Sequence, residues 1–182
     1  MKTNSVFFIF LLVLGFYLLA FNHSGEVDGL FADSKEVKVD KNTMVENGFV
    51  KLLKEENLAI DKDVYILNFW ASWCSPCMNE LPGLSRLSHL YKSKGVEVIT
   101  VNIDYENQEK IIKKIKKDLS LDMKIIQDKN GKYVERFNIE GLPITMFFQK
   151  TSLNDLVAGE IDFDSTETHE KIDQLLKLSE KN

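Results

Sequence analysis

Short apolar runs alternate with amphipathic segments along the chain from about residue 35 to its end. Runs without a polar alternation are typical of strands that are buried on both faces of a sheet. They predict strands over 64–70, 96–103, 123–127 and 144–149, with a weaker edge strand over 156–161. The segments between them favour helices over 49–57, 76–92, 107–119, 132–137 and 166–178. Helices between strands imply crossover connections, so we predict an α/β fold whose sheet carries helices on both faces.

The first residues form a separate apolar segment. An unbroken apolar run over 6–21 would rise about 24 Å as a helix, a little less than the roughly 30 Å core of a bilayer. Lys2 precedes the run and acidic residues follow it, so the positive-inside rule places the rest of the chain outside the cytoplasm. We predict a signal anchor or signal peptide over 1–21, a flexible linker over 22–35 and one domain over 36–182. Cleavage of the first segment would give a secreted protein rather than a membrane-anchored one.

Composition and charge narrow the classes of protein. A chain of 182 residues with 44% hydrophobic and 28% charged residues suits one globular domain with a short appendage. The net charge is −5, and Arg86 and Arg136 are the only arginines, which argues against a nucleic-acid partner. The chain has two cysteines, too few for a scaffold stapled by several disulfides.

Cys74 and Cys77 form a C-x-x-C motif shortly after the expected strand 64–70. A structural zinc site needs two further soft ligands, and His89 has no second histidine at ligand spacing. Haem attachment needs a histidine directly after the second cysteine, where Met78 stands. A purely structural disulfide between Cys74 and Cys77 would stabilise the fold little, because it closes a loop of only two residues. A dithiol that cycles between thiol and disulfide explains the motif best, and we expect neither a metal nor a cofactor.

Pro76 indicates that the motif opens a helix, since proline suits the first helical turn. Cys74 would then lie at the positive end of that helix, where unpaired amides stabilise a thiolate and lower its pKa. Cys77 would lie almost one turn inside and be shielded. We therefore expect Cys74 to attack a substrate disulfide and Cys77 to resolve the mixed disulfide.

The string 68–77 (NFWASWCSPC) resembles the thioredoxin superfamily, and the resemblance covers about residues 36–180. It implies a thioredoxin-like fold, in which a central mixed β-sheet is flanked by helices. Pro82 is similar in position to the proline that kinks the active-site helix of these proteins. Trp70, at the end of a buried strand, is expected in the core.

The resemblance also implies a substrate-binding surface around the dithiol. Gly141-Leu142-Pro143, just before the expected strand 144–149, is similar to the cis-proline loop of the superfamily. A cis peptide there would place the backbone of Leu142 against the sulfur of Cys74, where an extended substrate can pair. The expected substrate-binding residues are Trp73, Ser75, Pro76, Leu142 and Pro143.

Within the superfamily the chain is more similar to membrane-anchored oxidoreductases of the TlpA/ResA type. Asn68 stands where cytoplasmic thioredoxin has a buried aspartate, and Glu80 matches an acidic residue of the anchored proteins. Residues 103–121 are the expected insert of this branch. Glu80 follows Cys77 by about one turn and would exchange protons with it if burial raises the Glu80 pKa. A solvated glutamate on the helix surface is the alternative.

These likenesses imply a thiol-disulfide oxidoreductase that works outside the cytoplasm and reduces disulfides of exported proteins, with apocytochrome c as the favoured substrate. A membrane electron donor would keep the dithiol reduced in such a compartment. A thiol oxidant or isomerase remains an alternative, as does a copper carrier with Cys74 and Cys77 as soft ligands. A peroxidase is disfavoured, because Ala71 stands where that chemistry uses threonine or serine.

Overall fold

The apolar runs of the sequence form a single sheet in the structure, a computed structural model that describes residues 41–179. The predicted segments 1–21 and 22–35 lie outside the described residues. The strands of the described part are β1 (Val64–Trp70), β2 (Val96–Asn102), β3 (Lys124–Gln127), β4 (Ile144–Gln149) and β5 (Ser152–Ala158). Its helices are α2 (Lys41–Glu55), α3 (Ser75–Tyr91), α4 (Gln108–Asp118), α5 (Lys132–Arg136) and α6 (Thr166–Ser179), with a 3₁₀ turn η1 (Lys92–Lys94).

The sheet is mixed, with the strand order β3-β2-β1-β4-β5. Strands β1, β2 and β3 run parallel, whereas β4 is antiparallel to β1 and β5 is antiparallel to β4. Every residue of β1 is buried, which explains why its sequence shows no polar alternation. The loop that leaves this central strand at Trp70 therefore emerges at the middle of the carboxyl edge of the sheet, where open α/β sheets bind ligands.

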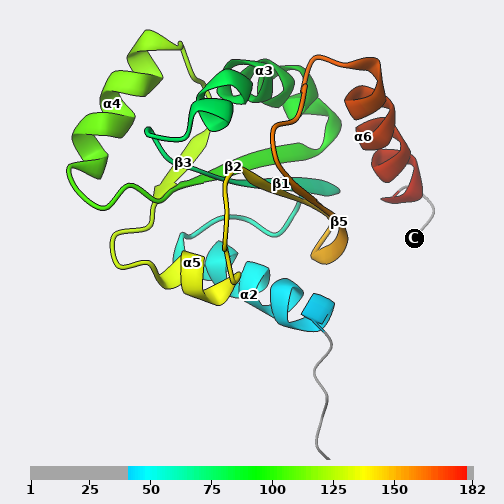
Figure 1. The fold of residues 1–182 in the computed structure, drawn as a ribbon. Helices are drawn as coiled ribbons and strands as arrows, with labels where there is room; N and C mark the ends of the chain where they lie inside the picture. Colours follow the sequence, from blue (N-terminus) through cyan, green and yellow to red (C-terminus); the bar gives the residue numbers. More distant parts are fainter. Residues whose placement is uncertain (1–40, 180–182) are drawn as a thin grey trace, which may run out of the picture. The chain divides into compact units, whose positions relative to one another are not determined.

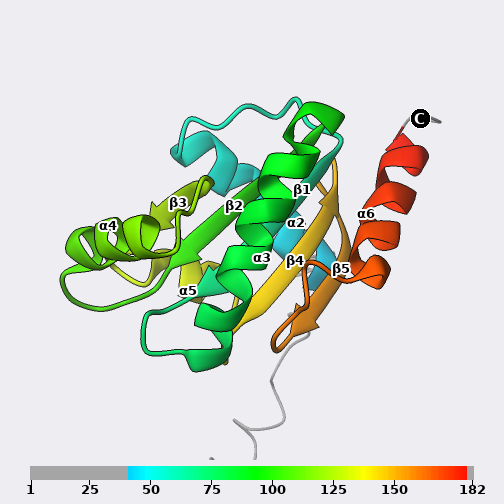
Figure 2. The ribbon, with the colours of Figure 1, turned by 90° about the horizontal axis from the view of Figure 1, so that it is seen from above.

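Helices cover both faces of the sheet, as the sequence predicted (Figure 1). Successive side chains of β1 point to opposite faces and enter two separate hydrophobic clusters. One cluster takes Ile66 and Trp70 together with side chains of α3, α4 and α6. The other takes Leu67 and Phe69 with side chains of α2 and α5. Figure 2 shows α3, which carries the dithiol at its first turn, lying over the sheet between α4 and α6.

The predicted bounds differ from the structure at the edges of the fold. The edge strand is 152–158 rather than 156–161, because its side chains alternate between exposed and half-buried and leave no continuous apolar run. Helix α2 begins at Lys41 rather than at residue 49. Only Val45 and Gly48 of its first half are buried, so this half of the helix shows no clear apolar pattern in the sequence. The expected insert 103–121 contains α4, and the strand that follows lies at 124–127. Within residues 41–179, no helix is both long and apolar enough to cross a membrane.

Candidate active site

The two cysteines lie where the loop after β1 turns into α3. Cys74 is the N-cap residue of the helix, with extended backbone angles (φ −89°, ψ 102°), and proline occupies the first turn. The Sγ atom of Cys74 accepts a hydrogen bond from the backbone N–H of Cys77 at 3.3 Å. The two sulfurs are joined in a disulfide, and the Cα atoms of the pair lie 5.2 Å apart. The position predicted from Pro76 is therefore confirmed, because the first sulfur sits among the free amides of a helix N-terminus.

The two sulfurs differ in their access to solvent. Cys74 is 6% exposed and lines an open cleft, whereas Cys77 is completely buried in the cluster beneath α3. A partner protein can therefore reach the first sulfur only. Trp70 is also fully buried, as expected, and its indole N–H donates to Thr100 Oγ1 at 3.2 Å.

Glu80 is buried at 4% exposure on the same helix, so the alternative of a solvated surface glutamate is wrong. Its Oε1 atom accepts a hydrogen bond from Asn68 Nδ2 at 2.8 Å, and its Oε2 atom accepts one from the backbone N–H of Ile161 at 2.9 Å. Removal from water nevertheless raises the pKa of the Glu80 carboxyl to about 7, because burial destabilises the charged form by more than these two donors stabilise it. The carboxyl group is thus able to gain and lose a proton near neutral pH.

Asn68 connects this carboxylate to the centre of the sheet. Its Nδ2 atom donates to Thr145 Oγ1 at 3.0 Å as well as to Glu80. The Oδ1 atom of Asn68 is buried and has no hydrogen-bond partner within the described residues. A buried acceptor without a donor is costly to the folded state.

The Leu142–Pro143 peptide bond is cis, as the resemblance implied. Leu142 lines the same cleft as Cys74, while Pro143 is buried directly before β4. The backbone carbonyl of Pro143 accepts a hydrogen bond from Gly159 N–H at 2.9 Å. This bond ties the loop to the end of β5 and fixes its position beside the dithiol.

The cleft over the dithiol has a volume of about 820 Å³. Trp73, Ser75, Pro76 and Leu142, four of the five residues predicted to bind substrate, line it together with Cys74. Trp73 is 64% exposed, so its ring forms part of the rim. The structure thus brings together side chains from the first turn of α3 and from the loop before β4, which are far apart in the sequence.

Comparison with protein families matches residues 44–153 to the model of the AhpC/TSA family. The chain belongs to the AhpC/TSA family. Among curated relatives, the thiol-disulfide oxidoreductase ResA of a Bacillus cereus strain is 32% identical over 159 residues, which cover 82% of this chain and 85% of that protein. ResA of Oceanobacillus iheyensis is 33% identical over 103 residues, covering 56% of this chain and 53% of that protein. The Cys74–Cys77 pair and these relatives together identify this AhpC/TSA-family protein as a thiol-disulfide oxidoreductase.

Solved structures with the same architecture establish that the fold is thioredoxin-like. The structure of StoA from Bacillus subtilis superposes with a TM-score of 0.53 at 24% identity, over 63% of this chain and 83% of that one. A structure from Chlorobium tepidum described as a DsbE-type thiol:disulfide interchange protein gives a TM-score of 0.57 at 24% identity, over 64% and 82%. Both confirm the predicted fold class.

The sequence did not single out the other wall of the cleft. Asp104 and Tyr105, just after β2, and Asp128 and Lys129, just after β3, line it opposite the dithiol. Their positions in the sequence could have indicated this wall, because they directly follow β2 and β3, and these parallel strands end at the same edge of the sheet as β1. A cluster of three or more histidine, cysteine, aspartate or glutamate side chains that could hold a metal ion is absent from residues 41–179.

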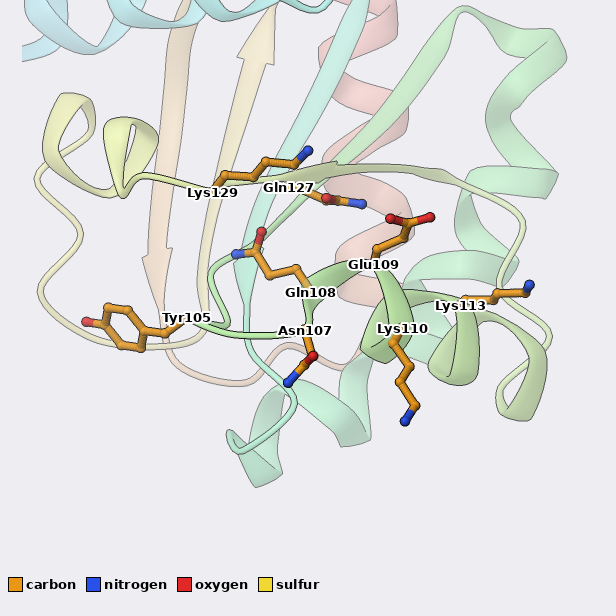
Figure 3. A pocket seen from close by; sticks show the side chains of 8 residues that line it. All are labelled: Tyr105, Asn107, Gln108, Glu109, Lys110, Lys113, Gln127 and Lys129. Carbon is orange, nitrogen blue, oxygen red and sulfur yellow. The ribbon is translucent and has the colours of Figure 1, made fainter.

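A second hollow of about 590 Å³ adjoins this wall at the N-terminus of α4. Figure 3 shows the eight side chains that line it, which include Lys110, Lys113 and Lys129. The three ammonium groups point in different directions and do not converge on one point (Figure 3). This hollow therefore lacks the geometry of an anion site, although it shares Tyr105 and Lys129 with the cleft over the dithiol.

Proposed function

We propose that the protein reduces disulfides of exported proteins outside the cytoplasm, held at the membrane by its N-terminal apolar segment. The observation that supports this most directly is the pair of unequal sulfurs, one in the cleft as the cap of α3 and one completely buried. The apolar run over 6–21 and the acidic residues after it support the location. The favoured substrate is apocytochrome c, whose haem-binding C-x-x-C-H cysteines must be reduced.

The reaction begins at Cys74. Its thiolate, stabilised by the helix N-terminus and the N–H of Cys77, attacks one sulfur of the substrate disulfide. A mixed disulfide forms, and the other substrate sulfur leaves as a thiolate that takes a proton from water. The cleft shields this intermediate, while the backbone beside the cis peptide of Leu142 offers an extended substrate chain hydrogen bonds.

Cys77 then releases the substrate. Its buried thiol must lose a proton before it attacks the sulfur of Cys74 and expels the second substrate thiolate. We assign Glu80 as the base that accepts this proton, because its pKa of about 7 suits transfer near neutral pH and it lies one turn further along α3. The product is the Cys74–Cys77 disulfide, and two electrons have moved to the substrate. A membrane electron donor would return the pair to the dithiol.

A trapping experiment tests the proposal. In a Cys77→Ser variant of the full chain, the mixed disulfide at Cys74 cannot be resolved and accumulates. We expect membranes that contain this variant to yield an adduct with an exported protein, joined through a C-x-x-C-H cysteine. The matched Cys74→Ser variant should yield none, because its remaining sulfur is buried. Equal adducts with both variants, or adducts that do not involve Cys74, would contradict the mechanism.

A further inference from the structure

A buried carboxylate fastens the loop that carries the dithiol to the loop after β2. Asp104 is 4% exposed, and its Oδ1 atom accepts a hydrogen bond from the hydroxyl of Ser72 at 2.9 Å. Its Oδ2 atom accepts the backbone N–H of Ser72 at 3.1 Å and the side-chain amide of Asn102 at 2.6 Å. Three donors thus hold one carboxylate, so the two loops have a fixed spacing at this point.

A second buried side chain holds the base of the same loop. Gln108, at the start of α4, is 6% exposed. Its Nε2 atom donates to the carbonyl oxygen of Asp104 and, at 3.3 Å, to that of Asp128. The segment between β2 and α4 is therefore anchored at both ends to the sheet edge rather than free to move.

The residues that follow the hydrogen-bonded pair Ser72 and Asp104 are large and exposed. Trp73 follows Ser72 and is 64% exposed, and Tyr105 follows Asp104 and is 94% exposed. Of the large apolar side chains that the structure describes, Tyr105 is the most exposed. Both rings line the cleft that contains Cys74. Figure 3 shows that Tyr105 points away from α4 and from the other labelled side chains, so nothing drawn there covers it.

We propose that Tyr105 and Trp73 form an aromatic subsite for an apolar side chain of the substrate, next to the disulfide that Cys74 attacks. Asp104 is the positioning residue that sets the spacing of the two rings. Aromatic side chains are enriched among the residues that contribute most to binding energy in interfaces, and they supply a large contact area at a low cost in conformational entropy. The occupant is an extended segment of the exported protein whose disulfide is reduced. This inference rests on the proposed function, since it assigns the substrate preference of the same cleft.

Binding can be tested without the redox reaction. In two otherwise identical peptides, serine replaces every cysteine so that no thiol-disulfide exchange occurs. The residue next to one of these former cysteine positions is phenylalanine in the first peptide and serine in the second. We expect the oxidised full chain to bind the phenylalanine peptide about tenfold more tightly than the serine peptide. Tyr105→Ala should abolish this preference, whereas Tyr105→Phe should keep most of it. Leu90→Ala provides the control, because Leu90 is also half exposed but lines a different hollow on α3.

The positioning role has its own test on disulfide versions of the two peptides. Asp104→Ala removes the acceptor for the hydroxyl and backbone N–H of Ser72 and for the side-chain amide of Asn102, so the loops should separate. We expect KM for the phenylalanine peptide to rise about threefold relative to the serine peptide, with kcat unaffected. Ser72→Ala, which removes one hydroxyl, should act in the same direction and less strongly.

The outcomes separate the two proposals. A wild-type chain that binds with the expected preference but reduces neither disulfide peptide overturns the proposed reductase and leaves the subsite standing. Equal binding of both peptides by the wild type, or an unchanged preference in Tyr105→Ala, overturns the subsite whatever the redox result. An equal rise of KM for both peptides in Asp104→Ala overturns the positioning role.

Discussion

Replacement of Glu80 by glutamine should change how the stability of the protein depends on pH. In the folded state the carboxyl pKa is about 7, and in the unfolded chain it returns to 4.5. The folded state therefore binds the proton more tightly, so this group stabilises the fold fully below pH 4.5, and the stabilisation is lost as pH rises through 7. The shift corresponds to about 3 kcal/mol, at about 1.4 kcal/mol for each pH unit between 4.5 and 7.

Urea unfolding of the oxidised protein between pH 4.5 and 8 measures this effect. Wild type should lose about 3 kcal/mol more unfolding free energy over that range than Glu80→Gln, since glutamine does not titrate. Glutamine has one acceptor for the two donors that now reach Glu80, so the variant should be less stable overall at low pH. The exposed Glu170→Gln is the matched control and should follow wild type. Parallel curves for wild type and Glu80→Gln would refute the argument from burial.

Two further substitutions test how the fold around the site is held. Gly95→Ala should lower the unfolding free energy in a urea titration by about 1–2 kcal/mol, because φ is +90° there and a Cβ would lie 2.9 Å from Asp63 Oδ2. Gly141→Ala is the control and should change the unfolding free energy little, because that position has open space and no left-handed φ. Thr100→Val should cost about 1–3 kcal/mol, because the buried indole N–H of Trp70 loses its acceptor. A thermal midpoint equal to that of wild type would contradict the second prediction.

The sequence predicted most reliably the elements whose surroundings are uniform. Strands 64–70 and 144–149 have the predicted bounds, because their central residues are buried on both faces and a predominantly apolar run marks each strand. The first turn of α3 was equally predictable, since Pro76 restricts its own backbone whatever lies nearby. The edge strand 152–158 was misplaced, because its half-exposed side chains produce no distinct run.

The sequence by itself determined the central strands of the sheet and the helix that begins at the dithiol, since these depend on residues within a few positions of one another. Only the tertiary structure decided that Glu80 is buried, because its donors lie on β1 and after β5, up to 81 positions away. The hydrogen bond between Asp104 and Ser72, which are 32 positions apart, could not be predicted from the sequence for the same reason. Burial and hydrogen bonding depend on which segments the sheet brings side by side, and local periodicity carries no information about partners beyond the next helical turn.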